Sequence, residues 1–293
     1  MKVLLLGHSG QLGKSLLRTV PDSINFKIDT VYGRKILIEQ NLKNIINNFA
    51  PNIIINSLAY TNVEKAENDD GVFDANSYFL KTISKVINKK IFLIHISTDY
   101  VFDGNKNTPY HPLDITNPIN KYGKSKLLGE NNIKKYIENY NIIRTSSLFS
   151  KNGVNFVKKM INLIRDKKRI SVVNDQIFTP TPCEDLSQLI WSIVLNHNFQ
   201  SVENQIYHFS GNGRALTWFD FANLIKNALF YNCIIEPQKT INMNKTICIF
   251  PNTILAKDIN DMAKMRYDVN HIVRNNCYNN GEARIHLSYW RKY

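Results

Sequence analysis

Short apolar runs alternate with longer amphipathic segments through the first half of the chain. The apolar runs are rich in β-branched residues and have the length of buried strands, whereas the segments between them carry apolar residues at helical spacing. This alternation predicts an α/β fold in which helices cover both faces of a parallel sheet. We expect strands at residues 2–6, 26–29, 52–56, 91–97 and 141–144, and helices that begin near residue 12 or cover residues 40–48 and 74–88.

The alternation weakens in the second half of the chain, although helical spacing persists in places. After Leu229 the sequence is rich in Asn and has no clear period, so the pattern assigns no elements there. The absence of an internal repeat and of a low-complexity linker argues against separable modules. We expect helices over residues 155–166, 182–195 and 217–229, the last two with N-caps formed by Thr181 and Thr217.

The composition excludes several classes of protein but does not identify a ligand. The 293 residues are 43% hydrophobic, enough for a sizeable core. The four cysteines lack zinc-site or redox spacing, and the apolar runs are too short for a signal peptide or a membrane span. We therefore expect a cytoplasmic protein with no membrane partner. The net charge of +13 comes from scattered lysines rather than from a basic run interleaved with aromatics, so we expect no nucleic-acid partner.

A glycine-rich turn follows the first predicted strand. Gly7, Gly10 and Gly13 precede or open a helix, where the backbone can approach a pyrophosphate closely. This setting favours a dinucleotide site over a merely structural turn. Asp29 could bind the adenosine ribose and favour NADH, whereas Arg34 could pair with the 2′-phosphate of NADPH, so the sequence leaves NADPH or NADH open.

Tyr122 and Lys126 are four residues apart and therefore share one face of a helix. A nearby ammonium lowers the pKa of a phenol, so Tyr122 could give a proton to a carbonyl oxygen as a hydride reaches the carbon. Alone, the pair is equally compatible with a chance arrangement on an exposed helix.

A third segment, residues 97–104, follows the fourth predicted strand and places Thr98 at the carboxyl edge of the sheet. Its hydroxyl could hydrogen-bond a substrate carbonyl, although the segment could also be a strand end capped by an Asp-Gly turn. The three motifs occur in this order on suitable elements, and the combination favours catalysis.

Together, these segments resemble the dTDP-4-dehydrorhamnose reductase family of extended short-chain dehydrogenases. The resemblance covers about the first 220 residues and rests on GHSGQLG, NSLAYTNVEKAE, STDYVFDG, YGKSK, RTS, NFVKKM and VNDQIFTPTP. It implies a Rossmann-type doubly wound parallel sheet over residues 1–146 and a smaller α/β substrate domain over 147–293, some segments of which return to the first domain. It also implies NAD(P)H-dependent reduction of the 4-keto group of a nucleotide-activated deoxysugar, for polysaccharide or lipopolysaccharide biosynthesis.

The resemblance assigns roles to individual positions. Catalysis would fall to Thr98, Tyr122 and Lys126. The substrate would lie against Thr98, Asp99, Tyr100 and Ser147. The cofactor would contact Gly7, Gly10, Gln11, Leu12, Gly13, Asp29, Ala59, Tyr60, Thr61, Ser97, Tyr122 and Lys126.

Three departures from the family pattern bear on the substrate and on metal binding. Ser147 replaces a tryptophan whose ring usually lies against the substrate, and residues 250–253 lack the usual arginine. Ser15 replaces a glutamate that binds magnesium in some members, so we expect no required metal. With the catalytic trio complete, a different deoxysugar or nucleotide carrier is as compatible with the sequence as the rhamnose precursor.

Two other functions remain open on the same fold. A nucleotide-sugar epimerase or dehydratase would reduce and reoxidise its bound NAD within one turnover. A non-catalytic regulatory subunit, like that of methionine adenosyltransferase, would bind NAD(P) and a partner, although the intact trio counts against it. The sequence also leaves the oligomeric state open, with a homodimer as one option.

Overall fold

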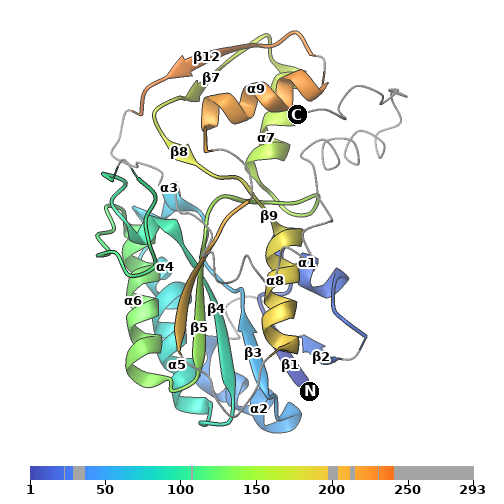
Figure 1. The fold of residues 1–293 in the computed structure, drawn as a ribbon, viewed down its shortest axis with the longest axis vertical. Helices are drawn as coiled ribbons and strands as arrows, with labels where there is room; N and C mark the ends of the chain where they lie inside the picture. Colours follow the sequence, from blue (N-terminus) through green and yellow to red (C-terminus); the bar gives the residue numbers. More distant parts are fainter. Residues whose placement is uncertain are drawn as a thin grey trace.

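A six-stranded parallel sheet forms the lower lobe of the computed structural model in Figure 1. The strands lie in the order β10-β5-β4-β3-β1-β2, and each neighbouring pair is parallel. The parallel sheet expected from the alternating pattern is therefore confirmed. Its strands are β1 (Lys2–Leu6), β2 (Asn25–Ile28), β3 (Ile53–Asn56), β4 (Phe92–Thr98), β5 (Tyr140–Thr145) and β10 (Gln205–Phe209). The structure describes residues 1–22, 24–28, 37–106, 108–196, 204–211, 215–229 and 231–240.

Helices cover both faces of this sheet because successive strand residues point to opposite sides. Val3 and Leu5 pack with helices α1 (Gln11–Arg18) and α8 (Cys183–Leu195). Leu4 and Leu6 pack into a second apolar cluster on the other face. The helices of that second face are α2 (Glu39–Phe49), α5 (Phe79–Val86) and α6 (Lys121–Tyr136).

The helix expected over residues 74–88 is shorter and less regular than its pattern suggested. Residues Asp74–Tyr78 form a π-helical turn, η2, and α5 follows it and ends at Val86. Two short helices, α3 (Val63–Ala66) and α4 (Gly71–Phe73), precede it. Helix α6 approaches this turn closely, because a Cβ on Gly129 would lie 2.2 Å from the carbonyl oxygen of Asn76. The irregular turn therefore coincides with the place where α6 packs on its neighbour.

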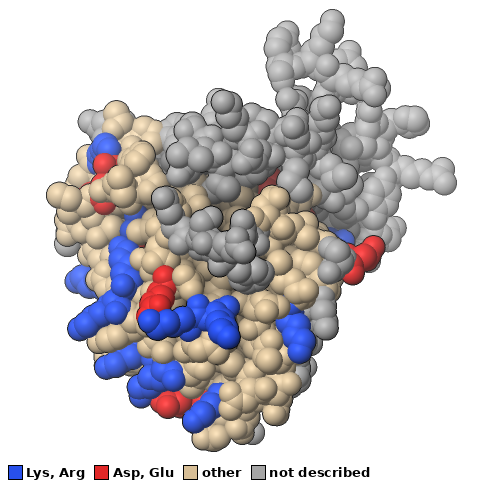
Figure 2. All heavy atoms as spheres, turned by 60° about the horizontal axis from the view of Figure 1, so that its bottom comes forward, with Lys and Arg blue, Asp and Glu red and all other residues tan. Residues whose placement is uncertain are grey.

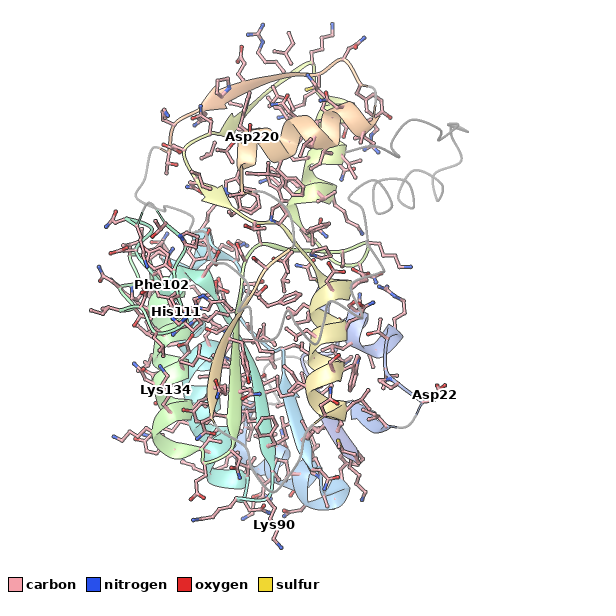
Figure 3. The ribbon with its side chains drawn as sticks, in the orientation of Figure 1. Asp22, Lys90, Phe102, His111, Lys134 and Asp220 are labelled. Carbon is pink, nitrogen blue, oxygen red and sulfur yellow. The ribbon has the colours of Figure 1, made fainter. Side chains whose placement is uncertain are left out.

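The upper lobe of Figure 1 has its own aromatic core. Phe178 and Phe221 are buried there, and the ring of Trp218 stacks on Phe178 with centroids 3.8 Å apart. The predicted capping of α9 is confirmed, because Thr217 and Asp220 exchange hydrogen bonds at its start, where Figure 3 labels Asp220. The elements of this lobe are α7 (Phe156–Asp166), β7 (Arg169–Val173), β8 (Ile177–Phe178), β11 (Leu216–Thr217), α9 (Trp218–Leu229) and β12 (Ile234–Gln238).

The chain crosses between the lobes more than once. The paired strands β6 (Leu148–Phe149) and β9 (Thr181–Pro182) lie at the crossing, after which α8 packs beside α1 and β10 joins β5. The expected capping of α8 by Thr181 is wrong: Pro182 is the N-cap residue and makes no side-chain capping bond. Thr181 instead lies in β9, where its hydroxyl donates to the carbonyl of Thr179 and accepts from the amide of Gly211.

The charged surface of the lower lobe is mixed. Figure 2 shows Lys and Arg spread over the face at the bottom of Figure 1, with Asp and Glu among them. Ion pairs of this lobe include Lys85 with Glu39 and Lys89 with Glu138. Within the described ranges, no helix has the length and apolar character that a membrane span requires.

Candidate active site

A cavity of about 630 Å³ opens at the carboxyl edge of the sheet and reaches the upper lobe. Ligands of open α/β sheets bind at this edge, beside the point where the strand order reverses, here between β1 and β3. The cavity brings together residues from all three sequence motifs. The predicted site residues that line it are Gly10, Gln11, Leu12, Gly13, Ala59, Thr61, Ser97, Thr98, Asp99, Tyr100, Tyr122, Lys126 and Ser147.

Three predicted cofactor residues do not belong to this lining. Asp29 lies outside the described residues, as does Arg34. Gly7 and Tyr60 are described but do not line the cavity. Gly7 shapes the glycine-rich turn, and the backbone amide and carbonyl of Tyr60 hydrogen-bond with the side chain of Asn76. Their direct contact with a cofactor stays a prediction.

Sequence reasoning missed several lining residues. Ser57 and Val63 lie within the quoted segment that follows β3, so the motif contained a signal for them. Gly153, Val154 and Trp218 belong to the second half of the chain and reach the cavity through the arrangement of the lobes. The other missed lining residues are Ser9, Ile96, Thr145 and Leu148.

The glycine-rich turn is closely packed at two of its glycines. Gly7 has a φ of +87°, and a Cβ there would lie 2.5 Å from the amide nitrogen of Leu58. A Cβ on Gly13 would lie 2.3 Å from the carbonyl oxygen of Gly7. Gly10, by contrast, would place a Cβ at an ordinary contact distance of 3.5 Å from that oxygen. Gly7 and Gly13 therefore bring α1 against the turn, which presents the N-terminus of the helix to the cavity.

Gln11 links this turn to the crossing between the lobes. Its Nε2 donates to the carbonyl oxygen of Leu148 at 3.2 Å, and its Oε1 accepts from Asn155 Nδ2 at 3.4 Å. A Cβ on Gly153 would lie 3.2 Å from Gln11 Cβ, so the backbone of this segment runs close to Gln11. One side chain thus couples the glycine-rich turn to the segment that leads into the upper lobe.

Tyr122 lies in the first turn of α6, close to Thr98. Asn120 caps this helix by accepting from the amide of Gly123 at 2.7 Å. A Cβ on Gly123 would lie 2.1 Å from the carbonyl oxygen of Tyr100, so a glycine here lets α6 approach the 3₁₀-helical turn η3 (Asp99–Val101) that follows β4. Burial raises the pKa of Tyr122, and a hydrogen bond with Thr98 opposes that rise. The phenol is therefore protonated near neutral pH and can donate.

Lys126 is buried one turn further along α6. Its Nζ donates to the carbonyl oxygen of Ile96 at 2.7 Å and lies 3.2 Å from His95 Nε2. Burial lowers the pKa of Lys126 to about 8, against the opposing charge of Glu130. The expected lowering of the Tyr122 pKa by this ammonium is wrong, because burial dominates and raises that pKa.

Asp99 and Ser147 have unusual environments on the cavity wall. Burial raises the pKa of Asp99 to about 7, and hydrogen bonds with Ser146 and Thr98 oppose this rise. Ser147 has a φ of +41°, which is uncommon for a residue with a side chain. A substrate that contacted these residues would meet a carboxyl group that titrates near neutral pH and a small hydroxyl side chain.

A buried ion pair supports the site from behind. Glu130 on α6 accepts from Arg144 on β5 through both carboxylate oxygens, at 2.9 and 2.7 Å. Glu130 also accepts from the hydroxyl of Ser97 at 2.6 Å. These bonds join α6, β4 and β5 and so fix the helix that carries Tyr122 and Lys126.

A family model described as the RmlD substrate binding domain matches residues 1–246 of this chain. The chain belongs to this family. The resemblance recognised in the sequence is thereby confirmed.

Two named relatives and one solved structure are similar over most of the chain. A dTDP-4-dehydrorhamnose reductase of Escherichia coli is 34% identical over 232 residues, which are 77% of each protein. A dTDP-4-keto-6-deoxy-D-glucose reductase of Streptomyces niveus is 31% identical over 75% of this chain and 76% of its own. The crystal structure of dTDP-4-dehydrorhamnose reductase from Bacillus anthracis in complex with NADP is 31% identical, with a TM-score of 0.78, and covers 87% of this chain and 92% of that one.

Among the residues that the structure describes, no three His, Cys, Asp or Glu side chains are grouped as metal ligands would be. The expectation that no metal is required stays a prediction.

Proposed function

We propose that this protein reduces the 4-keto group of a nucleotide-activated deoxysugar with NADPH or NADH. The observation that carries the proposal is that Thr98, Tyr122 and Lys126 open into the same cavity as the glycine-rich turn. Membership of the family and the names of the two reductases support the same chemistry. The reduced sugar would serve polysaccharide or lipopolysaccharide biosynthesis.

The residues at the turn fit a dinucleotide. The close packing at Gly7 and Gly13 leaves the start of α1 exposed to the cavity, where its free amide groups favour a pyrophosphate. Ala59 and Thr61 follow β3 along the same edge. The bound nicotinamide would supply the hydride, and the NADP complex of the relative supports NADPH as one cofactor.

Tyr122 is the proton donor in this mechanism. The protonated phenol gives its proton to the ketone oxygen while the hydride reaches the ketone carbon, which forms a C–H and an O–H bond and leaves a tyrosinate. Thr98 steadies the developing negative charge on that oxygen. The buried ammonium of Lys126 stabilises the tyrosinate until solvent returns the proton.

The sugar-facing wall supports an altered substrate. Ser147 lines the cavity where the family usually carries tryptophan, and its small side chain leaves that space to the ligand or to another residue. Residues 250–253, the second departure, lie outside the described residues. We therefore propose a dTDP-linked 4-keto-6-deoxysugar as the class of substrate, without restriction to the rhamnose precursor.

Oxidation of NADPH and NADH by the purified protein, measured against a panel of 4-keto deoxysugar nucleotides, tests the proposal. We expect stoichiometric consumption of the cofactor with at least one sugar. Conversion of a sugar without net consumption would favour the epimerase or dehydratase. Cofactor binding without any conversion would favour the regulatory subunit.

A further inference from the structure

Two buried polar side chains that the proposed mechanism does not use lie beneath Lys126. His95 on β4 is 1% exposed, and Asn56 at the end of β3 is fully buried. The two residues are direct partners in the register of the neighbouring strands. His95 Nε2 lies 3.2 Å from Lys126 Nζ, and His95 Nδ1 lies 3.1 Å from Asn56 Nδ2. They form one row from the catalytic lysine into the sheet.

The orientation of Asn56 determines where the imidazole carries its proton. The amide of Leu58 donates to Asn56 Oδ1 at 3.2 Å, which directs Nδ2 at His95. Because Nδ2 is a donor, Nδ1 of His95 accepts, and the proton of the neutral ring lies on Nε2. Nε2–H then points at Lys126.

This arrangement favours the neutral amine of Lys126. An ammonium has only N–H donors, so it meets Nε2–H as a second donor. The ring can accept from the ammonium only if its proton moves to Nδ1, where it meets the amide hydrogens of Asn56. The neutral amine has a lone pair and accepts from Nε2–H without conflict.

The other groups around Lys126 have different effects. Glu130 on the same helix favours the ammonium, but it is already shared with Arg144 of β5 and lies 3.9 Å from Lys134. Tyr122 of α6 and Asp99 of the segment after β4 line the cavity beside Lys126. Burial, with a smaller effect of Lys126, lowers the pKa of His95 well below its ordinary value, so the ring stays neutral while the amine titrates.

We propose that His95, held by Asn56, is the positioning residue of Lys126 and sets the pH at which the lysine loses its proton. The pH profile of activity that reports this role rests on the proposed reductase function. Since the ammonium stabilises the tyrosinate, activity falls at high pH when Lys126 deprotonates. Replacing the Nε2–H donor by an acceptor moves that fall to higher pH.

Two variants change the row without replacing Lys126. His95→Gln can place a carbonyl oxygen near the position of Nε2, where it accepts from the ammonium. Asn56→Asp keeps the shape of Asn56 but accepts from Nδ1–H, which leaves the lone pair of Nε2 facing Lys126. We expect each variant to move the alkaline limb of kcat/KM upward by about one pH unit.

His208→Gln is the matched control, because His208 is also 1% exposed but contacts Arg144 and the carbonyl of Tyr110. We expect its alkaline limb to coincide with that of the wild type. An unshifted limb in folded His95→Gln and Asn56→Asp, or an equal shift in His208→Gln, would overturn the inference.

NMR of the protein labelled with ¹⁵N in its histidines tests the arrangement of Asn56, His95 and Lys126 without an activity assay. Asn56→Asp serves to assign the His95 signals if His95→Gln does not fold. We expect the proton on Nε2 at high pH and a change in the ring nitrogen shifts that follows the titration of Lys126. A proton fixed on Nδ1, or shifts that stay constant through that range, would contradict the inference whatever the substrate panel shows.

Discussion

The hydroxyl of Thr98 donates to the carboxylate of Asp99, with 3.0 Å between Oγ1 and Oδ1. Both side chains lie on the cavity wall, and Asp99 is 1% exposed. The carboxylate thus competes with a substrate carbonyl for the proton of Thr98. When Asp99 is protonated, its carboxyl group can donate to the hydroxyl oxygen of Thr98. The hydroxyl hydrogen of Thr98 is then free to hydrogen-bond the substrate carbonyl.

Asp99 makes the stability of the fold depend on pH. Burial raises its pKa from 3.8 to about 7 in the folded protein. Between these two pH values the folded state therefore holds a proton on Asp99 that the unfolded state has lost. Its stabilising contribution is full below about pH 4 and is lost as the pH rises to about 7. The expected loss is on the order of 1 kcal/mol per pH unit in that window.

Asp99→Asn removes this titration, so the variant should gain stability relative to the wild type between about pH 4 and 7. Urea unfolding at several pH values measures the difference. A constant difference in the free energy of unfolding across the window would show that Asp99 does not titrate as proposed.

Tyr122→Phe should lower kcat by about 100-fold or more, because the proposed proton donor is lost while the ring that packs edge-on against Tyr100 is kept. Thermal unfolding should change little, and steady-state kinetics measures the loss. A kcat within a few-fold of the wild-type value would assign proton donation to another group.

Gly13→Ala should destabilise the protein by about 1–3 kcal/mol, because its Cβ would collide with the carbonyl oxygen of Gly7. Gly10→Ala in the same turn is the control, since its Cβ has room. Urea unfolding without cofactor compares the two, and equal stability of both variants would remove the steric argument.

Arg144→Met should cost about 3–5 kcal/mol, because it leaves the buried carboxylate of Glu130 without its main partner. Glu130→Leu combined with Arg144→Met should recover much of that loss, since no buried charge then remains unpaired. A double-mutant cycle of unfolding free energies measures the coupling. Simple additivity of the two changes would mean that the pair contributes nothing.

Local patterns predicted most of the sheet and the helices, because the strands are buried and alternate with amphipathic segments. Strand β10 was not predicted: it spans five residues of mixed polarity, and its identity depends on pairing with β5. Strand β12 likewise pairs with β7 from a segment without clear periodicity. Both depend on partners distant in the sequence.

The site residues likewise fall into those that a local motif predicts and those that only the packing of the chain brings to the cavity. Gly13, Thr98 and Tyr122 lie in motifs whose spacing carries chemical meaning, and all three line the cavity. Trp218 reaches the same cavity from the upper lobe and Val154 from the segment that leads into that lobe, which no local pattern could indicate. The error about the Tyr122 pKa has a similar origin, because the burial that raises this pKa arises only when α6 packs against the 3₁₀-helical turn after β4.

Transfer of deuterium from C4 of the reduced nicotinamide tests the central claim most directly. We predict that the sugar product carries the label at C4 and that one cofactor is oxidised for each sugar reduced. A product without label at that carbon, or a cofactor that is recovered in its original redox state after turnover, would contradict the assignment as a 4-keto reductase.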